Sequence, residues 1–176
     1  MKNSFKNTLK LTLCAVLAGL SFVAMYLGNI TGVFDLCAVV VGALCMAFAV
    51  IEFGGVWPWL VCFVTSVLSL VLLPDKMVAL EYIFLGGIYP ILKRVFENRG
   101  RIISLILKAV YCNVALTVVI VLIKFVFVTA ESSAMIVWLI YLIGNAFFFI
   151  FDYSLTTFIT FYLLRLRKKL RIKDMH

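Results

Sequence analysis

The sequence has little charge, almost no histidine and none of the common catalytic motifs. Asp, Glu, Lys and Arg make up 14% of its 176 residues, and the one histidine is His176. It contains no GxSxG, HExxH or P-loop pattern, and no pair of glutamates of the kind that intramembrane proteases use. So few general bases indicate that the chain is not an enzyme. Without a P-loop it cannot hydrolyse ATP itself, so any energised role requires a partner protein.

The cysteines form neither a metal site nor a disulfide framework. They are odd in number, lie within apolar runs and form no CxxC pair. Together with the single terminal histidine, this pattern predicts no bound metal and no cofactor. We interpret them as small apolar packing residues: Cys14, Cys37, Cys45, Cys62 and Cys112.

Apolar residues make up 65% of the chain, which is more than a soluble domain of this size can bury. The excess indicates that lipid solvates much of the surface. The net charge is +8, but the basic residues lie at the ends of apolar runs. This position is typical of charges that orient a membrane protein and contact anionic lipid headgroups, and it argues against a nucleic-acid partner.

The apolar runs predict an all-α integral membrane bundle, a single transmembrane domain over residues 1–176. The runs are continuous rather than alternating, which favours helices over barrel strands. The fourth run is shorter than a typical span and could be re-entrant. We read the first as an uncleaved helix rather than a signal peptide. The six predicted transmembrane helices cover about 9–27, 33–53, 56–73, 77–92, 102–128 and 134–164.

Basic residues predict the orientation of these helices, because cytoplasmic loops carry an excess of Lys and Arg. One cluster precedes the first helix, one surrounds the connection between the fourth and fifth, and one forms a basic tail at 165–176. With six helices all three clusters fall on one side. We therefore expect a multi-pass cell-membrane protein with both termini in the cytoplasm.

Two charged residues within the apolar runs are candidates for a functional site. Glu81 lies four residues into the fourth helix and Lys124 four residues before the end of the fifth, so each is about 6 Å below the outer face. Charges inside a membrane are costly and are often functional. These two could bind a polar ligand together, or form a structural ion pair.

Uncharged polar residues add a second set of candidates. One face of the sixth helix carries Trp138, Tyr141, Asn145, Asp152 and Thr156. Asn113 and Asp152 lie about 17 and 18 Å from the cytoplasmic ends of their helices, so a hydrogen bond between them is expected. Such pairs can be interhelical contacts without a ligand. The candidate substrate-binding residues are Glu81, Tyr82, Lys124, Trp138, Tyr141 and Asn145.

Ala15 and Gly19 form a small-xxx-small pair in the first helix. Such a pair allows another helix to approach closely. The approaching helix could belong to the same bundle or to a partner subunit.

The chain resembles the substrate-binding S components of energy-coupling factor (ECF) transporters over most of its length. The first helix, LTLCAVLAGLSFVAMYLG, is similar to the family's opening helix, whose alanine-x-x-x-alanine motif reads Ala15 to Gly19 here. The stretch LLLPDKMVALEYIFLGGIYPILK also resembles members of the family. The resemblance implies capture of a vitamin-like small molecule from outside. It also implies docking of the first helix on a transmembrane coupling subunit, which works with two ATPases.

Two other functions fit the sequence. One is a membrane scaffold or assembly subunit without a ligand, in which every polar residue is structural. The other is a small channel or secondary transporter that uses Asp152 as a proton-coupled site.

Overall fold

The computed structural model describes residues 2–32, 34–127 and 134–166, with side chains for 7–32, 34–100, 102–122 and 138–165. All regular structure in these ranges is helical, so the prediction of an all-α protein is confirmed. The elements are α1 (Lys2–Thr31), α2 (Asp35–Glu52), α3 (Trp57–Leu72), α4 (Lys76–Glu81), η1 (Tyr82–Ile88), α5 (Tyr89–Glu97), α6 (Arg101–Phe127), α7 (Ala134–Phe161) and η2 (Tyr162–Leu166), where η marks a π-helix.

Four helical stretches in the described part of the chain are long and apolar enough to cross a membrane. They cover Asn7–Thr31, Asp35–Glu52, Ile102–Leu122 and Trp138–Arg165. The α3 helix is apolar but has only 16 residues, about 24 Å at 1.5 Å per residue. The α4, η1 and α5 segments follow one another without a break between Lys76 and Glu97. Together these helices indicate a membrane-associated protein.

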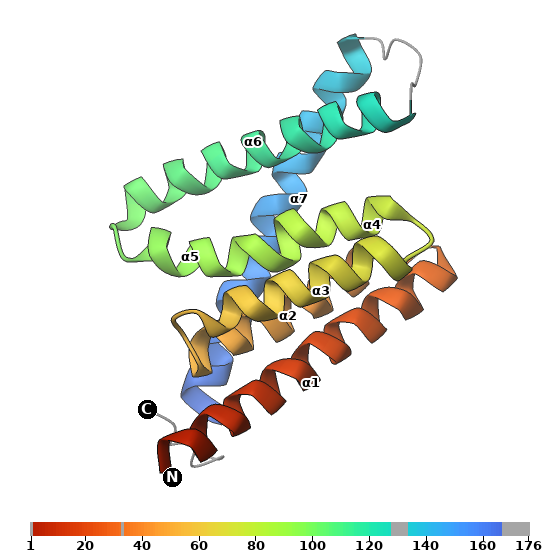
Figure 1. The fold of residues 1–176 in the computed structure, drawn as a ribbon. Coiled ribbons are helices and arrows are strands. Elements are labelled where there is room, and N and C mark those ends of the chain that lie inside the picture. Colours follow the sequence, from red (N-terminus) through yellow and green to blue (C-terminus); the bar gives the residue numbers. More distant parts are fainter. Residues whose placement is uncertain (1, 33, 128–133, 167–176) are drawn as a thin grey trace. The chain divides into compact units, whose positions relative to one another are not determined.

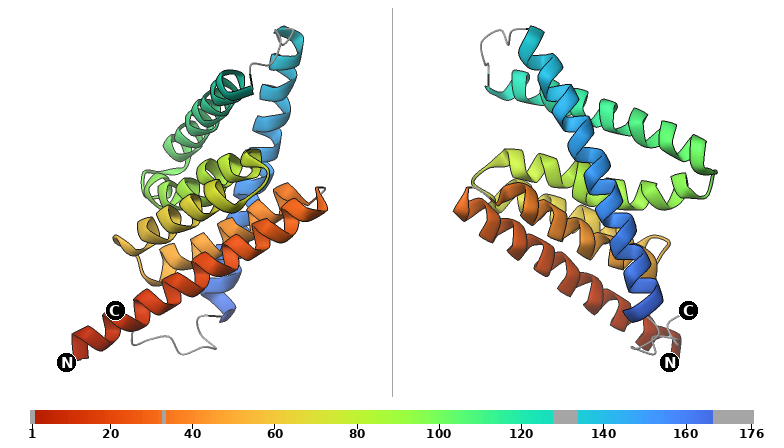
Figure 2. Two further views of the ribbon diagram at one scale, coloured as in Figure 1. Left: turned by 45° about the vertical axis from the view of Figure 1, so that its right-hand side comes forward. Right: turned by 180° about the vertical axis from the view of Figure 1, so that it is seen from behind.

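The chain divides into two compact units, Met1–Arg94 with Leu155–His176, and Val95–Ser154. In the first unit α1, α2, α3 and the α4–η1–α5 helix lie side by side (Figure 1, Figure 2). Small residues allow close packing here: Ala43 and Ala49 of α2 are fully buried, as is Met46 between them. Burial of such residues removes apolar surface from solvent and allows helix backbones to approach.

The turns of the first unit follow from a few residues. Gly54 and Gly55 adopt φ values of 58° and 59°, which residues with a Cβ rarely adopt, and they reverse the chain between α2 and α3. Asp75 caps α4 by accepting a hydrogen bond from the Met77 amide at 2.8 Å. The Lys76 ammonium donates to the carbonyls of Leu70 and Leu73 at 2.9 and 2.7 Å, which satisfies the C-terminal end of α3.

The π-helical segment η1 accommodates the ring of Tyr82 in the core. A Cβ at Gly42 of α2 would lie 2.8 Å from this ring, and one at Gly86 would lie 2.5 Å from it. Tyr82 is fully buried and packs with Met25 and Val39. The two glycines therefore provide the space that the aromatic ring fills.

Candidate functional site

In the second unit, a pair of asparagines joins α6 to α7. The Asn113 amide donates to Asn145 Oδ1 at 3.3 Å, and the Asn145 amide donates back to Asn113 Oδ1 at 3.2 Å. The second hydrogen of each amide is bound to its own helix, at the carbonyls of Ala109 and Tyr141. All four amide hydrogens are thus used, while each side-chain oxygen keeps a lone pair for a further donor.

A second polar contact lies one turn away. The hydroxyls of Thr117 and Tyr141 are 2.7 Å apart, and Thr117 Oγ1 also bonds to the Asn113 carbonyl at 2.7 Å. Asn113 and Thr117 are exposed, whereas Tyr141 is half-buried. Trp138, one turn further along α7, exposes 78% of its surface. Tyr141, Asn145 and their α6 partners therefore form a continuous polar strip along two apolar helices.

Three charged residues meet near the start of α6. The Lys108 ammonium lies 2.9 Å from Asp152 Oδ2 and 3.1 Å from Glu97 Oε1. The side chain of Lys108 is 9% exposed, that of Asp152 14% and that of Glu97 42%. The Lys108 ammonium thus pairs with two carboxylates, and of the three side chains only that of Glu97 is substantially exposed.

The hydrogen bond expected between Asn113 and Asp152 does not form, because Asn113 pairs with Asn145 instead. Equal depth would place Asn113 beside Asp152 only if the two helices ended in one plane. In the structure Asn113 lies beside Asn145, which is seven residues before Asp152. No sequence signal identifies the Lys108–Asp152 pair, because it depends on the register between α6 and α7 that the structure shows. The same register brings Asp152 close to Lys108, because Asp152 is seven residues after Asn145 and Lys108 is five residues before Asn113.

Sequence reasoning also missed the role of Lys93, which was counted among the orienting charges. Lys93 is 1% exposed, and its ammonium donates to Thr156 Oγ1 at 2.7 Å. Glu52, 2% exposed, accepts a hydrogen bond from the Tyr162 hydroxyl at 2.8 Å. Both bonds lie within the first unit and connect the C-terminal part of α7 and η2 to α5 and α2. Their charged partners give these contacts more strength than neutral hydrogen bonds.

Glu81 and Tyr82 belong to the first unit. Glu81 is partly buried at the end of α4. The Tyr82 hydroxyl is buried and has no hydrogen-bond partner among the described residues. The buried hydroxyls of Ser21 and Thr65 each donate to a carbonyl of their own helix, Leu17 and Val61. Tyr82 therefore places an unsatisfied polar atom inside a packed core, which is unusual.

Ala15 and Gly19 lie on the outward side of α1. Ala15 is exposed, and a Cβ added at Gly19 would meet no atom within 4 Å. The neighbouring face of the helix, with Cys14 and Ala18, packs into the core of the first unit. The small pair is thus uncovered by the described residues of the first unit.

Lys124 lies within α6, but its side chain is outside the described residues, so its predicted pairing with Glu81 stays a prediction. Of the other predicted site residues, Tyr141 and Asn145 are in contact, because the Asn145 amide donates to the Tyr141 carbonyl, and Tyr82 is buried. No group of three or more potential metal ligands occurs among the described residues.

Comparison with known proteins gives no match: no family model, no curated protein and no solved structure is similar to this chain.

Proposed function

We propose that the chain is the substrate-capture subunit of a membrane importer of the ECF type. It binds a vitamin-like small molecule at the outer side and docks on a transmembrane coupling subunit whose partner ATPases supply the energy. In this proposal α3 and the α4–η1–α5 helix also cross the membrane, which gives six spans with both termini in the cytoplasm. The three basic clusters of the sequence support this orientation.

The observation that carries the proposal is the uncovered small pair on α1. Ala15 is exposed, and nothing lies within 4 Å of a Cβ built at Gly19. Larger exposed residues flank the pair, including Val16, Leu20 and Val23. Small residues between larger ones form a shallow strip that a partner helix can approach closely, which is the usual basis of helix association in membranes.

The proposed ligand-binding residues lie on α4 in the first unit, and on α6 and α7 in the second. Glu81 and Lys124 are the proposed charged contacts to the ligand, and Trp138, Tyr141 and Asn145 are the proposed uncharged ones. The polar strip supports this proposal, because the lone pairs left on the Asn113 and Asn145 oxygens can accept hydrogen bonds. We therefore expect the ligand to present a donor, such as an amide or hydroxyl, to this strip. A few polar groups among apolar side chains are typical of small-molecule sites.

Replacing both Ala15 and Gly19 with leucine is expected to abolish co-purification with the coupling subunit, because the added side chains fill the strip. The melting temperature should stay near that of the wild type, since neither position is packed against the described chain. The measurement is pull-down of the partner subunit from solubilised membranes.

Two variants control this experiment. Ala146→Leu adds the same bulk at an exposed position of α7 and should leave partner binding intact. Ala18→Leu adds it to the core, where Ala18 is 4% exposed, and should lower stability by about 1–3 kcal/mol. If the Ala15 and Gly19 double variant loses stability as Ala18→Leu does, the pair packs inside the protein and the docking proposal is wrong.

A scaffold subunit without a ligand is a second candidate. The reciprocal Asn113–Asn145 bonds and the Thr117–Tyr141 contact support it, because they tie α6 to α7 without any ligand. A secondary transporter that uses Asp152 has less support, since this carboxylate already has a cationic partner in Lys108.

A further inference from the structure

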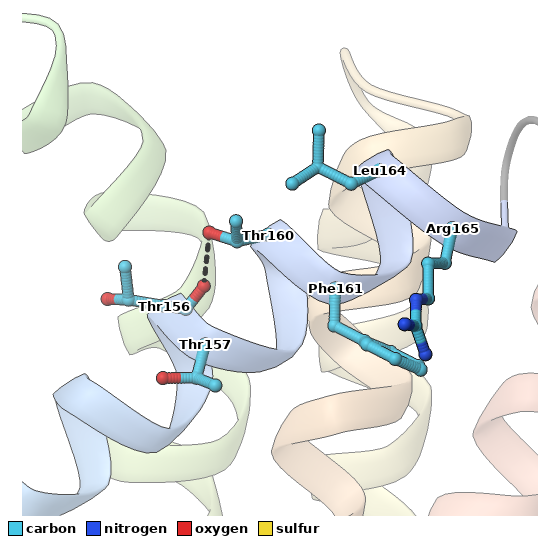
Figure 3. A pocket seen from close by; sticks show the side chains of 6 residues that line it. All are labelled: Thr156, Thr157, Thr160, Phe161, Leu164 and Arg165. Atoms are coloured by element: carbon cyan, nitrogen blue, oxygen red, sulfur yellow. Dashed lines mark hydrogen bonds between the residues drawn. The ribbon is translucent and has the colours of Figure 1, made fainter.

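The C-terminal part of α7 and the adjoining η2 carry a shallow groove of about 390 Å³ on their outer surface (Figure 3). All its lining residues belong to the first unit and come from about two and a half turns of helix. They are Thr156, Thr157, Thr160, Phe161, Leu164 and Arg165.

The groove is less polar than its threonines suggest. The Thr160 hydroxyl donates to the Thr156 carbonyl at 2.8 Å, which Figure 3 shows as a bond along the helix itself. Thr156 Oγ1 accepts the hydrogen bond from Lys93 at 2.7 Å. These hydroxyls are already engaged, and the exposed Phe161 and Leu164 side chains add apolar surface. The groove is therefore better suited to an acyl chain than to a sugar or nucleotide.

The guanidinium of Arg165 lies at one end of this apolar surface. The Arg165 guanidinium lies 5.8 Å from the centre of the Phe161 ring, a cation–π contact that favours this position. Thr156 is nine residues away, so the groove extends about 13 Å along the helix axis. Arg165 is also the last residue of the apolar stretch that begins at Trp138, and this stretch is about 42 Å long against a hydrocarbon core of about 30 Å.

A bilayer with its headgroup regions is about 40–45 Å thick, so a stretch of this length that spans it would place Arg165 at headgroup depth and the threonines near the first acyl carbons. Five further basic residues follow Arg165 in the sequence, so the whole end of the chain favours an anionic surface. A positive head above an apolar groove matches the charge and shape of one class of molecule, an anionic phospholipid.

We propose that this groove is a binding site for one anionic phospholipid, with the phosphate at Arg165 and an acyl chain along Thr160 and Phe161. The site is independent of the substrate site and of the α1 strip. It would attach the C-terminal segment of the first unit to the cytoplasmic leaflet.

The test is native mass spectrometry of the full chain in detergent, titrated with phosphatidylglycerol, phosphatidylcholine or inorganic phosphate. We expect one phosphatidylglycerol to bind more tightly than phosphatidylcholine. Arg165→Gln should weaken phosphatidylglycerol binding about fivefold, the effect of one basic residue near a lipid surface. The matched control is Arg99→Gln, which removes the same charge from another exposed position and should leave binding unchanged.

A second variant tests the groove without changing any charge. Thr160→Trp places a large side chain over the acyl position and should also weaken phosphatidylglycerol binding. Equal losses in Arg165→Gln and Arg99→Gln would mean that lipid responds only to total charge, and would overturn the proposal. Wild-type affinity in Thr160→Trp would overturn the acyl-chain assignment, and competition by inorganic phosphate alone would show that the site binds phosphate rather than lipid.

Discussion

Replacing Lys108 with methionine is expected to lower the free energy of unfolding by about 3–5 kcal/mol, the usual cost of breaking a buried ion pair from one side. The substitution keeps the length of the side chain but leaves Asp152, 14% exposed, without the ammonium at 2.9 Å. It also removes the bond to Glu97 at 3.1 Å. The measurement is denaturant unfolding of the purified protein in mixed micelles.

Two further variants separate the partners of Lys108. Glu97→Gln should cost less than about 1 kcal/mol, because the Glu97 side chain is 42% exposed and exposed pairs contribute little. The double variant Lys108→Met, Asp152→Leu should recover most of the lost stability, since an apolar pair replaces a buried charged one. If Lys108→Met is no more harmful than Glu97→Gln, the Lys108–Asp152 pair does not hold α6 to α7.

Replacing Tyr82 with alanine is expected to cost about 3–5 kcal/mol, as large-to-small changes of buried aromatic residues do. The ring is fully buried and lies against Gly42 and Gly86, which have no side chains to fill the space that it would leave. Thermal unfolding of the solubilised protein measures the loss.

Tyr82→Phe is the matched control. It keeps the ring and removes only the hydroxyl, which is buried and has no partner in the described part of the protein. Its stability should equal or slightly exceed that of the wild type, because a buried polar group without a bond is costly. A loss of more than about 1 kcal/mol would show that the hydroxyl does make a stabilising hydrogen bond.

The helices could be predicted from the sequence, because a continuous apolar run has no other way to satisfy its backbone in lipid. The run expected at 33–53 is the helix Asp35–Glu52, and the run at 56–73 is Trp57–Leu72. The first helix is longer than its apolar run, Lys2–Thr31 against 9–27, since hydropathy detects only the part that lipid would solvate.

The contacts between polar residues could not be predicted from depth alone. Depth from a helix end gives a pairing only if both helices end at the same level, and Asn113 pairs with Asn145 rather than Asp152 for that reason. Likewise, Lys93 and Lys108 are indistinguishable in sequence from charges that face water. Their burial, at 1% and 7% exposure, depends on which helices pack around them.

The most direct test of the proposed capture function is mass spectrometry of small molecules released by denaturing the gently purified, full-length chain. We expect about one equivalent of a single vitamin-like compound per folded wild-type chain. Glu81→Gln and Lys124→Met should each retain much less of it at a near-normal melting temperature. A folded wild-type preparation that carries no small molecule, or variants that retain as much as the wild type, would contradict the proposed capture function and favour a scaffold.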